Sequence, residues 1–244
     1  MLIYGINPVL EALKAKQVTR LRVSARSDRR MDEVLALAGA GRVPVERIDA
    51  QALDRAARGG VHQGVVAEVE NAREYGVEEL LEGEGVPLLV VLDGLEDPHN
   101  VGAILRTCDA AGATGVIRQT RHAAALDGVV GKASAGALAR VRIATVVNIA
   151  RAVDTLKSAN VWTIGLAGDA DESYTDVDWT LPSALVVGAE GPGLRRLVRE
   201  TCDRVVRLPM HGAVDSLNVS VAAGVVLYEA VRQRAEATER QGRR

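Results

Sequence analysis

Three segments of the 244-residue chain combine polar side chains with turn-forming residues in a way that could build a ligand site. The first, residues 93–107, follows an apolar run and opens a helical pattern, with Asn100 at the helix start and Arg106 nearly two turns later. Open α/β sheets bind ligands at this point, outside the carboxyl ends of the strands. A helix cap and a surface arginine would explain the two residues equally well. Because Arg106 has apolar neighbours in the sequence, we expect it to be partly buried.

The second segment, GAEGPG at residues 188–193, lies between a strand pattern and a helix pattern. Its glycines permit positive φ angles and a close approach of the backbone to a ligand, and Glu190 would point toward the same edge of the sheet. The segment is neither a Walker loop, since no Gly-Lys-Ser/Thr follows, nor a GxGxxG fingerprint. Taken alone, it is more typical of an ordinary strand-to-helix turn than of a site.

The third segment, residues 208–220, leads from a strand through a loop into the last helix. Asp215 or Ser216 could cap that helix. Asn218 and Ser220 would lie in its first turn, where free backbone N–H groups face the loop. Capping explains Ser216 without any function, but it explains Asn218 less readily because asparagine is a poor helix former.

Other kinds of site are not indicated. The histidines have no metal-ligand spacing, so we expect no metal site. No nucleophile elbow occurs, and no Ser-His-Asp order is compelling. Cys108 and Cys202 lie in apolar helical patterns and are predicted to be small core residues of a protein from a reducing compartment.

Apolar periodicity predicts the elements that must position these segments. Asn7 should cap the first helix, with Pro8 at its first position. The first block then alternates as in a small α/β layer domain, with helices at 8–15, 31–40 and 50–57 and strands at 21–24, 43–48 and 65–69. The second block has a doubly wound α/β pattern, with strands at 88–92, 115–117, 141–146, 161–167, 184–187 and 205–208 and helices at 101–111, 148–158, 194–202 and 217–235.

Charge is distributed unevenly along the chain. Residues 1–73 carry 12 Lys and Arg against 9 Asp and Glu (12 − 9 = +3), and residues 74–86 carry five Glu with no basic residue. Residues 87–244 are balanced, with 18 of each sign. The pattern predicts an N-terminal domain at residues 1–70, an acidic linker at residues 71–86 and a C-terminal domain at residues 87–244.

Composition limits the partners. An aromatic content of 2% excludes an RNA-binding face built on rows of stacked rings. A net charge of −2 argues at first sight against nucleic acid, but it averages a basic first block with an acidic linker. The arginines of that block either form a solvated face or contact phosphates; they are Arg20, Arg22, Arg26, Arg29 and Arg30. No signal peptide or membrane-length apolar run is visible, so a soluble cytoplasmic protein is the default.

The three segments together resemble a known family. NVGAILRT, VVGAEGPG and LPM…SLNVSVA, in this order, are similar to the signature motifs of the SpoU/TrmH RNA ribose 2′-O-methyltransferases of the SPOUT class. The match spans roughly residues 88–234. The N-terminal block, from YGINPV to HQGV, is similar to a ribosomal-protein-like substrate-binding domain that several members carry. The resemblance implies an α/β C-terminal domain with a deep trefoil knot, S-adenosylmethionine as cofactor, and a homodimer.

The resemblance also implies roles for individual residues. Gly188, Leu208 and Leu217 would line the cofactor pocket, mostly through the backbone, with Met210, Ser216 and Asn218 beside them. The catalytic or substrate-positioning positions are Asn100, Arg106, Glu190, Ser216 and Asn218. The family proposal makes Arg106 the general base, but a guanidinium, whose pKa lies above about 12, is a poor one. We favour Arg106 as a phosphate clamp that polarises the hydroxyl, and Glu190 as the base or as a group that orients Arg106 or Asn100.

The layout as a whole is most similar to a subfamily that methylates a guanosine in the peptidyl-transferase region of 23S ribosomal RNA, either free or in a large-subunit precursor. A transfer-RNA ribose methyltransferase is a second possibility, which the added N-terminal domain disfavours. A non-catalytic RNA-binding or assembly protein of the same fold is a third, which the complete set of catalytic positions disfavours. The lack of GxGxxG after the first strand of the second block argues against a nucleotide-binding dehydrogenase.

Overall fold

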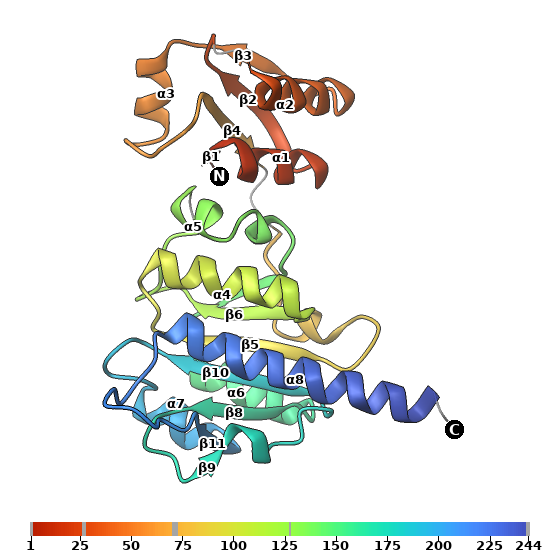
Figure 1. Ribbon diagram of the computed structural model, residues 1–244, viewed down its shortest axis with the longest axis vertical. Helices are drawn as coiled ribbons and strands as arrows, with labels where there is room; N and C mark the ends of the chain where they lie inside the picture. The colour runs from red at the N-terminus through yellow and green to blue at the C-terminus, as the bar shows by residue number, and fades with distance from the viewer. Residues whose placement is uncertain (1, 26–27, 70–72, 127, 243–244) are drawn as a thin grey trace. The chain divides into compact units, whose positions relative to one another are not determined.

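The computed structural model describes residues 2–25, 28–69, 73–126 and 128–242. Contacts divide the chain into two compact units. The N-terminal unit comprises Met1–Arg73, Val101–Arg106 and Ala125–Arg140, and the C-terminal unit comprises Glu74–Asn100, Thr107–Ala124 and Val141–Arg244. Figure 1 gives the element labels used below.

The N-terminal unit is built on a four-stranded sheet of order β1-β4-β2-β3, in which only the β2–β3 pair is parallel. Its apolar core packs helices α1 and α2 against the sheet. Its elements are β1 (Leu2–Tyr4), α1 (Ile6–Lys14), β2 (Val18–Val23), α2 (Arg29–Ala40), β3 (Val45–Arg47), α3 (Ala50–Ala56), β4 (Val65–Val69), α5 (Gly128–Ala133) and the 3-10 turn η2 (Ala137–Ala139).

The first helix differs from its sequence prediction. It begins at Ile6, and its N-cap is Gly5, which has a φ of 92° that favours glycine. The Ile6 N–H is satisfied from elsewhere in the unit, by Gln63 Oε1 at 3.0 Å. The prediction of Asn7 as the cap is therefore wrong, and Pro8 is the third residue of the helix, still within the first turn, where a missing N–H costs little.

The C-terminal unit is built on a seven-stranded parallel sheet of order β7-β6-β5-β10-β8-β11-β9, as the doubly wound pattern predicted. Helices α6 and α7 pack together against one face through an apolar core, and α8 crosses the other face and contacts β10 (Figure 1). Its strands are β5 (Leu88–Asp93), β6 (Gly115–Gln119), β7 (Ile143–Val146), β8 (Trp162–Leu166), β9 (Glu172–Ser173), β10 (Ser183–Gly188) and β11 (Arg204–Arg207). Its helices are α6 (Ile149–Ser158), α7 (Arg196–Thr201), α8 (Val219–Gly242) and the 3-10 turns η1 (Glu78–Leu81) and η3 (Tyr174–Asp176), and α4 (Pro98–Ala111) has residues in both units.

The register of the two central strands sets up the site. Every residue of β5 and β10 is buried, which fits their continuous apolar sequences. In the β5–β10 pair, Asp93 lies opposite Gly188, so the first two polar segments leave the sheet side by side. Leu166, the last residue of β8, lies opposite Val187 of β10 and Val206 of β11. The loops that follow β5, β8, β10 and β11 therefore all lie at the carboxyl end of the sheet.

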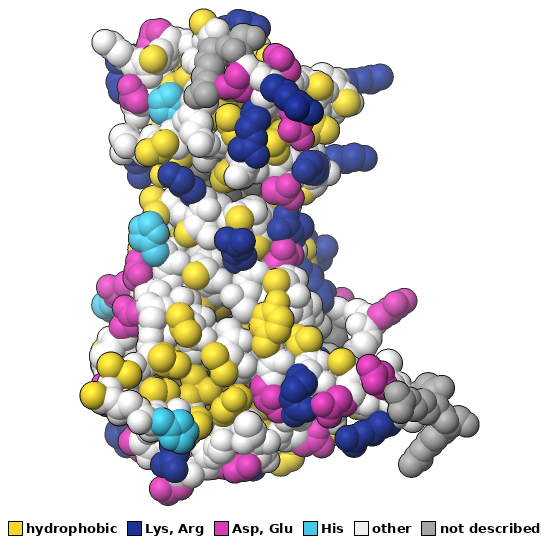
Figure 2. Space-filling view, in the orientation of Figure 1, with side chains coloured by type: hydrophobic (Ala, Val, Ile, Leu, Met, Phe, Trp, Pro, Cys, Tyr) yellow, Lys and Arg dark blue, Asp and Glu magenta, His cyan; other side chains and the backbone are white. Residues whose placement is uncertain are grey.

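Part of α8 exposes apolar side chains. Val221, Val225 and Tyr228 follow helical spacing and are 52%, 39% and 53% exposed. Hydrophobic side chains gather on the face that α8 crosses (Figure 2). Among the described helices, none is long and apolar enough to cross a membrane.

Candidate active site

The three polar segments meet at one side chain, that of Asn218. Its Nδ2 donates to Asn100 Oδ1 at 2.9 Å and to Glu190 Oε1 at 2.8 Å. Asn100 belongs to α4, Glu190 to the loop after β10, and Asn218 directly precedes α8. We call these three residues the polar triad. It joins two amides and a carboxylate that are far apart in the sequence.

Asn100 is not the cap of its helix, contrary to one of the two interpretations of the sequence. The N-cap is Asp97, whose carboxylate accepts from His99 N at 3.0 Å, and Pro98 occupies the first helical position. Asn100 therefore lies inside the first turn, and only 6% of it is exposed. Because capping does not require it, its contact with Asn218 is the feature that explains an asparagine here.

The cap of α8 is Asn218 rather than Asp215 or Ser216. Asn218 Oδ1 accepts from Ser220 N at 3.0 Å, from Val221 N at 3.4 Å and from Ser220 Oγ at 2.6 Å. The prediction placed this asparagine inside the first turn, but the helix begins at Val219, two residues later than predicted, because several residues of the loop can cap a helix. Ser216 Oγ instead donates to Asp215 Oδ1 at 3.2 Å.

The GAEGPG loop folds back on itself directly after β10. Ala189 N donates to Gly193 O at 3.1 Å, and Gly193 N donates to Ala189 O at 2.9 Å. Gly191 and Gly193 have φ angles of 83° and 68°, which favour glycine. A Cβ on Gly188 would lie 2.1 Å from the Gly193 carbonyl carbon. The loop conformation therefore depends on glycine at these positions, and it presents Glu190 at the sheet edge.

A cavity of about 400 Å³ lies beside the triad. It is lined by all six residues that the resemblance assigned to a cofactor pocket, namely Gly188, Leu208, Met210, Ser216, Leu217 and Asn218. Leu166, the last residue of β8, and the two residues after it also line the cavity, and the sequence analysis did not single them out. The available signal was their position at the end of the strand predicted at residues 161–167, because α/β proteins bind ligands at the carboxyl ends of their strands.

Arg106 lies on α4, six positions after Asn100, and its side chain is exposed. The prediction of partial burial is wrong, because the neighbours Ile104 and Leu105 turn their side chains to the buried face while the helix carries position 106 away from it. Arg106 is not a member of the hydrogen-bonded triad.

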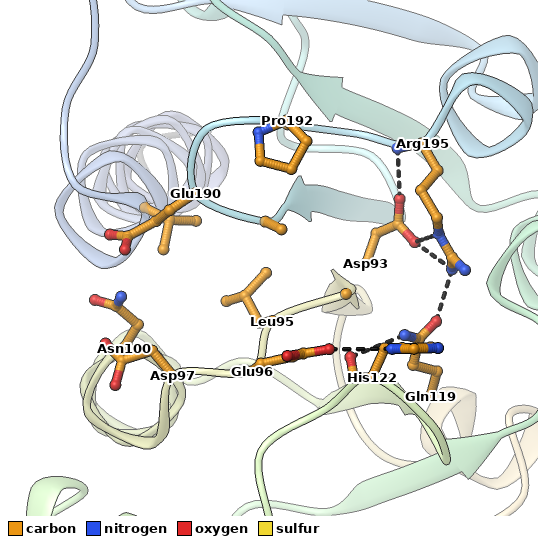
Figure 3. A pocket seen from close by; sticks show the side chains of 14 residues that line it. Asp93, Leu95, Glu96, Asp97, Asn100, Gln119, His122, Glu190, Pro192 and Arg195 are labelled. Atoms are coloured by element: carbon orange, nitrogen blue, oxygen red, sulfur yellow. Dashed lines mark hydrogen bonds and ion pairs between the residues drawn. The ribbon is translucent and has the colours of Figure 1, made fainter.

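A second cavity, of about 490 Å³, shares four lining residues with the first: Ala189, Glu190, Gly193 and Val219. In Figure 3, Asn100 and Glu190 face each other at one end of it, and Arg195, Gln119 and His122 lie at the other. The buried Asp93 accepts from Arg195 N at 2.8 Å and from Arg195 Nε at 2.6 Å, and it also contacts Arg195 Nη2. Sequence reasoning assigned no role to these residues.

The arginine cluster of the N-terminal unit is only partly available to a partner. Arg20, Arg29 and Arg30 are exposed. Arg22 is paired within the unit, with Glu68 Oε1 2.6 Å from its Nη2 and Glu46 Oε2 3.5 Å from its Nε. Arg26 lies outside the described residues.

Neither cysteine offers a nucleophile. Cys108 is buried and Cys202 is half-buried, and both are free thiols. Burial raises the pKa of each thiol to about 12, so both are protonated at neutral pH. Within the described parts of the chain, no group of His, Cys, Asp and Glu side chains could hold a metal ion.

Comparisons with known proteins agree with the motif arrangement. Residues 87–228 match the family described as "SpoU rRNA Methylase family". The chain belongs to this family. Residues 2–75 also match the description "RNA 2'-O ribose methyltransferase substrate binding". The chain therefore has a SpoU-family segment at residues 87–228, and residues 2–75, which precede it in the sequence, match the substrate-binding description.

SpoU-family relatives resemble the chain over almost its whole length. It is 48% identical to the 23S rRNA (guanosine-2'-O-)-methyltransferase RlmB of Pseudomonas putida, over 95% of this chain and 96% of that protein. The SpoU methyltransferase AviRb from Streptomyces viridochromogenes, in complex with the cofactor AdoMet, is 29% identical with a TM-score of 0.82, over 96% of this chain and 90% of AviRb. An AdoMet-bound rRNA methyltransferase from Sinorhizobium meliloti is 25% identical with a TM-score of 0.79, over 95% of this chain and 86% of that one.

Proposed function

We propose that this protein transfers a methyl group from S-adenosylmethionine to the ribose 2′-hydroxyl of a guanosine in 23S ribosomal RNA. The observation that carries the proposal is the polar triad, in which Asn218 lines the smaller cavity, Asn100 lines the larger one and Glu190 lines both. One cavity would take the cofactor and the other the nucleotide, with the triad between them. Support for the substrate comes from the relatives named 23S rRNA (guanosine-2'-O-)-methyltransferase, which match nearly the full chain.

The residues around the smaller cavity suit S-adenosylmethionine. Its volume of about 400 Å³ is within the usual range for a small-molecule site. Leu166, Leu208 and Met210 offer apolar contact, while the turns at Gly188 and Gly168 bring backbone N–H and C=O groups to the wall without side chains in the way. Bound there, the cofactor supplies a methyl group on a positively charged sulfur.

The triad is suited to handle the acceptor hydroxyl. The Glu190 carboxylate can take the 2′-hydroxyl proton as the oxygen–carbon bond forms. Asn218 donates to Glu190 Oε1, which fixes the carboxylate and leaves Oε2 for the hydroxyl. Asn100, bound to the same amide, limits Asn218 to one orientation. Arg106 would hold an RNA phosphate and polarise the hydroxyl, since the planar fork of an arginine guanidinium matches the geometry of a phosphate.

The test is incubation of the protein with radiolabelled S-adenosylmethionine and either 23S ribosomal RNA, precursor large-subunit particles or transfer RNA, followed by mapping of the modified nucleotide. We expect label on one guanosine ribose of 23S RNA. Label on transfer RNA alone would overturn the choice of substrate, and no label on any RNA would favour a binding protein of the same fold.

We also propose the assembly and setting that the resemblance implies. The protein forms a homodimer through the exposed apolar residues of α8, and its C-terminal segment is threaded in a trefoil knot around the cofactor loops. Residues 1–70 bind RNA through Arg20, Arg29 and Arg30, ahead of an acidic linker at 71–86 and the methyltransferase domain at 87–244. The protein acts in the cytoplasm, because the proposed substrate, ribosomal RNA, is located there.

A further inference from the structure

The larger of the two cavities holds a set of contacts that methyl transfer itself does not require. Gln119 Oε1 accepts from Arg195 Nη2 at 2.7 Å, and Gln119 Nε2 donates to the His122 carbonyl at 2.9 Å. Asp93, which anchors Arg195, and Gln119 are 1% and 4% exposed. Buried polar groups connected in this way give a fixed wall rather than an adaptable surface.

This wall positions one carboxylate that is not part of it. The fixed backbone at His122 has a φ of 52°, a left-handed conformation that is rare for residues other than glycine. From there the His122 ring contacts Glu96, with Nδ1 3.2 Å from Oε1. Glu96 lies in the loop between β5 and α4, lines the cavity and is largely exposed. Figure 3 shows Glu96 directed toward His122, at the end of the cavity away from Glu190.

We propose that this cavity receives the base of the target nucleotide and that the Glu96 carboxylate selects guanine; the inference rests on the proposed function. A ribose held at Asn100 and Glu190 leaves the attached base to extend along the cavity toward Glu96, and the apolar side chains of Leu95 and Pro192 line the same cavity. Enzymes that act on an unstacked nucleotide read its base through hydrogen bonds to the Watson–Crick edge.

Guanine is the base that matches a carboxylate. Its N1–H and its 2-amino group are adjacent donors, and a carboxylate has two acceptor oxygens and no donor. Adenine and cytosine present a ring acceptor at the equivalent place, and uracil presents one donor between two acceptors. Each would leave the carboxylate facing an acceptor. Asp93 is not available for this role because Arg195 occupies both of its oxygens.

The experiment compares methyl transfer to a short 23S RNA fragment that carries guanosine, inosine or adenosine at the mapped position. Inosine keeps N1–H and lacks the 2-amino group, so it removes one of the two hydrogen bonds. For the unmodified protein we expect kcat/KM to fall at least about tenfold with inosine and further with adenosine, because a site built to bind a donor rejects an analogue that lacks it.

The variant Glu96→Gln places an amide opposite the base. We expect its kcat/KM on the guanosine substrate to fall at least about tenfold, so that kcat/KM becomes nearly equal for the guanosine and inosine substrates. Its affinity for S-adenosylmethionine should remain unchanged. Glu200→Gln is the matched control: Glu200 is an exposed carboxylate on α7 that pairs with Arg196, and both its activity and its base preference should remain unchanged. Because Glu96 is exposed, the unfolding temperature should not move.

The outcomes separate the two proposals. Absence of transfer by the unmodified protein to any RNA overturns the proposed function and this inference with it. Active protein that accepts guanosine and inosine equally, or a Glu96→Gln variant that keeps the full guanosine preference, overturns the inference alone.

Discussion

At the scale of the residue, Asn218 has two tasks on one side chain. Its oxygen caps α8, and its nitrogen joins Asn100 to Glu190. The sequence singled out Asn218 because a poor helix former stood near a helix start. It could not show that the residue that caps α8 also belongs to the triad, since that depends on which loop residue the folded chain places beside Asn100.

Asn218→Asp should separate these tasks. The aspartate oxygen still accepts from the first turn of α8, so the free energy of unfolding should change by less than about 1 kcal/mol. The second oxygen cannot donate and repels Glu190, so we expect turnover to fall at least about 100-fold. Single-turnover methyl transfer and thermal unfolding measure the two effects. Asn148→Asp, the same change at the cap of α6, is the control and should remain active. Turnover of Asn218→Asp within a few-fold of the unmodified protein would contradict the role of the triad.

Arg106→Ala tests the phosphate clamp. We expect a loss of at least about two decades of turnover, while the affinity for S-adenosylmethionine measured by calorimetry survives, because Arg106 would act on the RNA and its hydroxyl. Arg196→Ala, at another exposed arginine of a surface helix, should have no effect. Activity within a few-fold of the unmodified protein would sink the assignment.

At the scale of the element, the site is formed by the loops at the carboxyl end of the parallel sheet. The carboxyl ends of β5, β8, β10 and β11 lie in register, and each is followed by a loop that lines one of the two cavities. Strand patterns predicted the existence of these ends. The order of the strands, with β10 between β5 and β8, is what makes segments about a hundred residues apart into neighbours.

Gly188→Ala should distort the loop at this end of the sheet without replacing a polar side chain. The added Cβ would meet the Gly193 carbonyl carbon at 2.1 Å, so the loop that carries Glu190 must move. We expect cofactor affinity and turnover both to fall, with a stability cost of about 1–3 kcal/mol. Calorimetric titration and denaturant unfolding give the two values. At Gly39, in α2, a Cβ meets nothing within 4 Å, so Gly39→Ala should be neutral or mildly stabilising. Undiminished cofactor binding by Gly188→Ala would contradict this account of the loop.

At the scale of the whole molecule, excess positive charge and exposed apolar surface lie in different parts of the chain. The basic excess lies in the first 73 residues, and the exposed apolar stripe lies on α8. A net charge of −2 conceals this division. Among the described arginines of the predicted cluster, Arg20, Arg29 and Arg30 are exposed and available for the proposed contact with RNA, whereas Arg22 is paired within its own unit.

Reversing Arg29 and Arg30 to glutamate should weaken binding to 23S RNA fragments and flatten the dependence of the binding constant on salt. The fold should survive, because both residues lie in the first turn of α2, where acidic side chains suit the helix dipole better than basic ones. Filter binding at several salt concentrations measures the slope. Reversal of Arg196 and Arg240 in the C-terminal unit changes net charge equally and serves as control. An unchanged slope would return the cluster to an ordinary solvated face.

Val225→Glu with Tyr228→Glu tests the homodimer. Charges placed in a desolvated apolar contact are strongly unfavourable, so the double variant should sediment as a monomer at concentrations where the unmodified protein is a dimer. Val147→Glu adds a charge at another exposed valine and should not alter the sedimentation. A monomeric unmodified protein would refute the dimer outright.

The sequence by itself predicted most of the helices and strands and the residue types of the site, but it missed β1, β9 and α5. Burial of β5 and β10, the glycine turn at residues 188–193 and the polar positions Asn100, Glu190 and Asn218 all follow from local pattern, because periodicity and turn chemistry act over a few residues. The cap of α8 and the start of α1 were misplaced for the same reason, since several neighbouring residues satisfy a helix end almost equally well.

Tertiary structure alone decided what these residues do together. Only strand order and register bring Asn218 to Asn100 and Glu190, and only they pair Asp93 with Arg195, a contact between residues 102 positions apart. Residues 101–106 and 125–140 cluster with the N-terminal unit, which no compositional boundary indicated. Such contacts depend on loop closure and packing over the whole chain, and a local pattern carries no information about them.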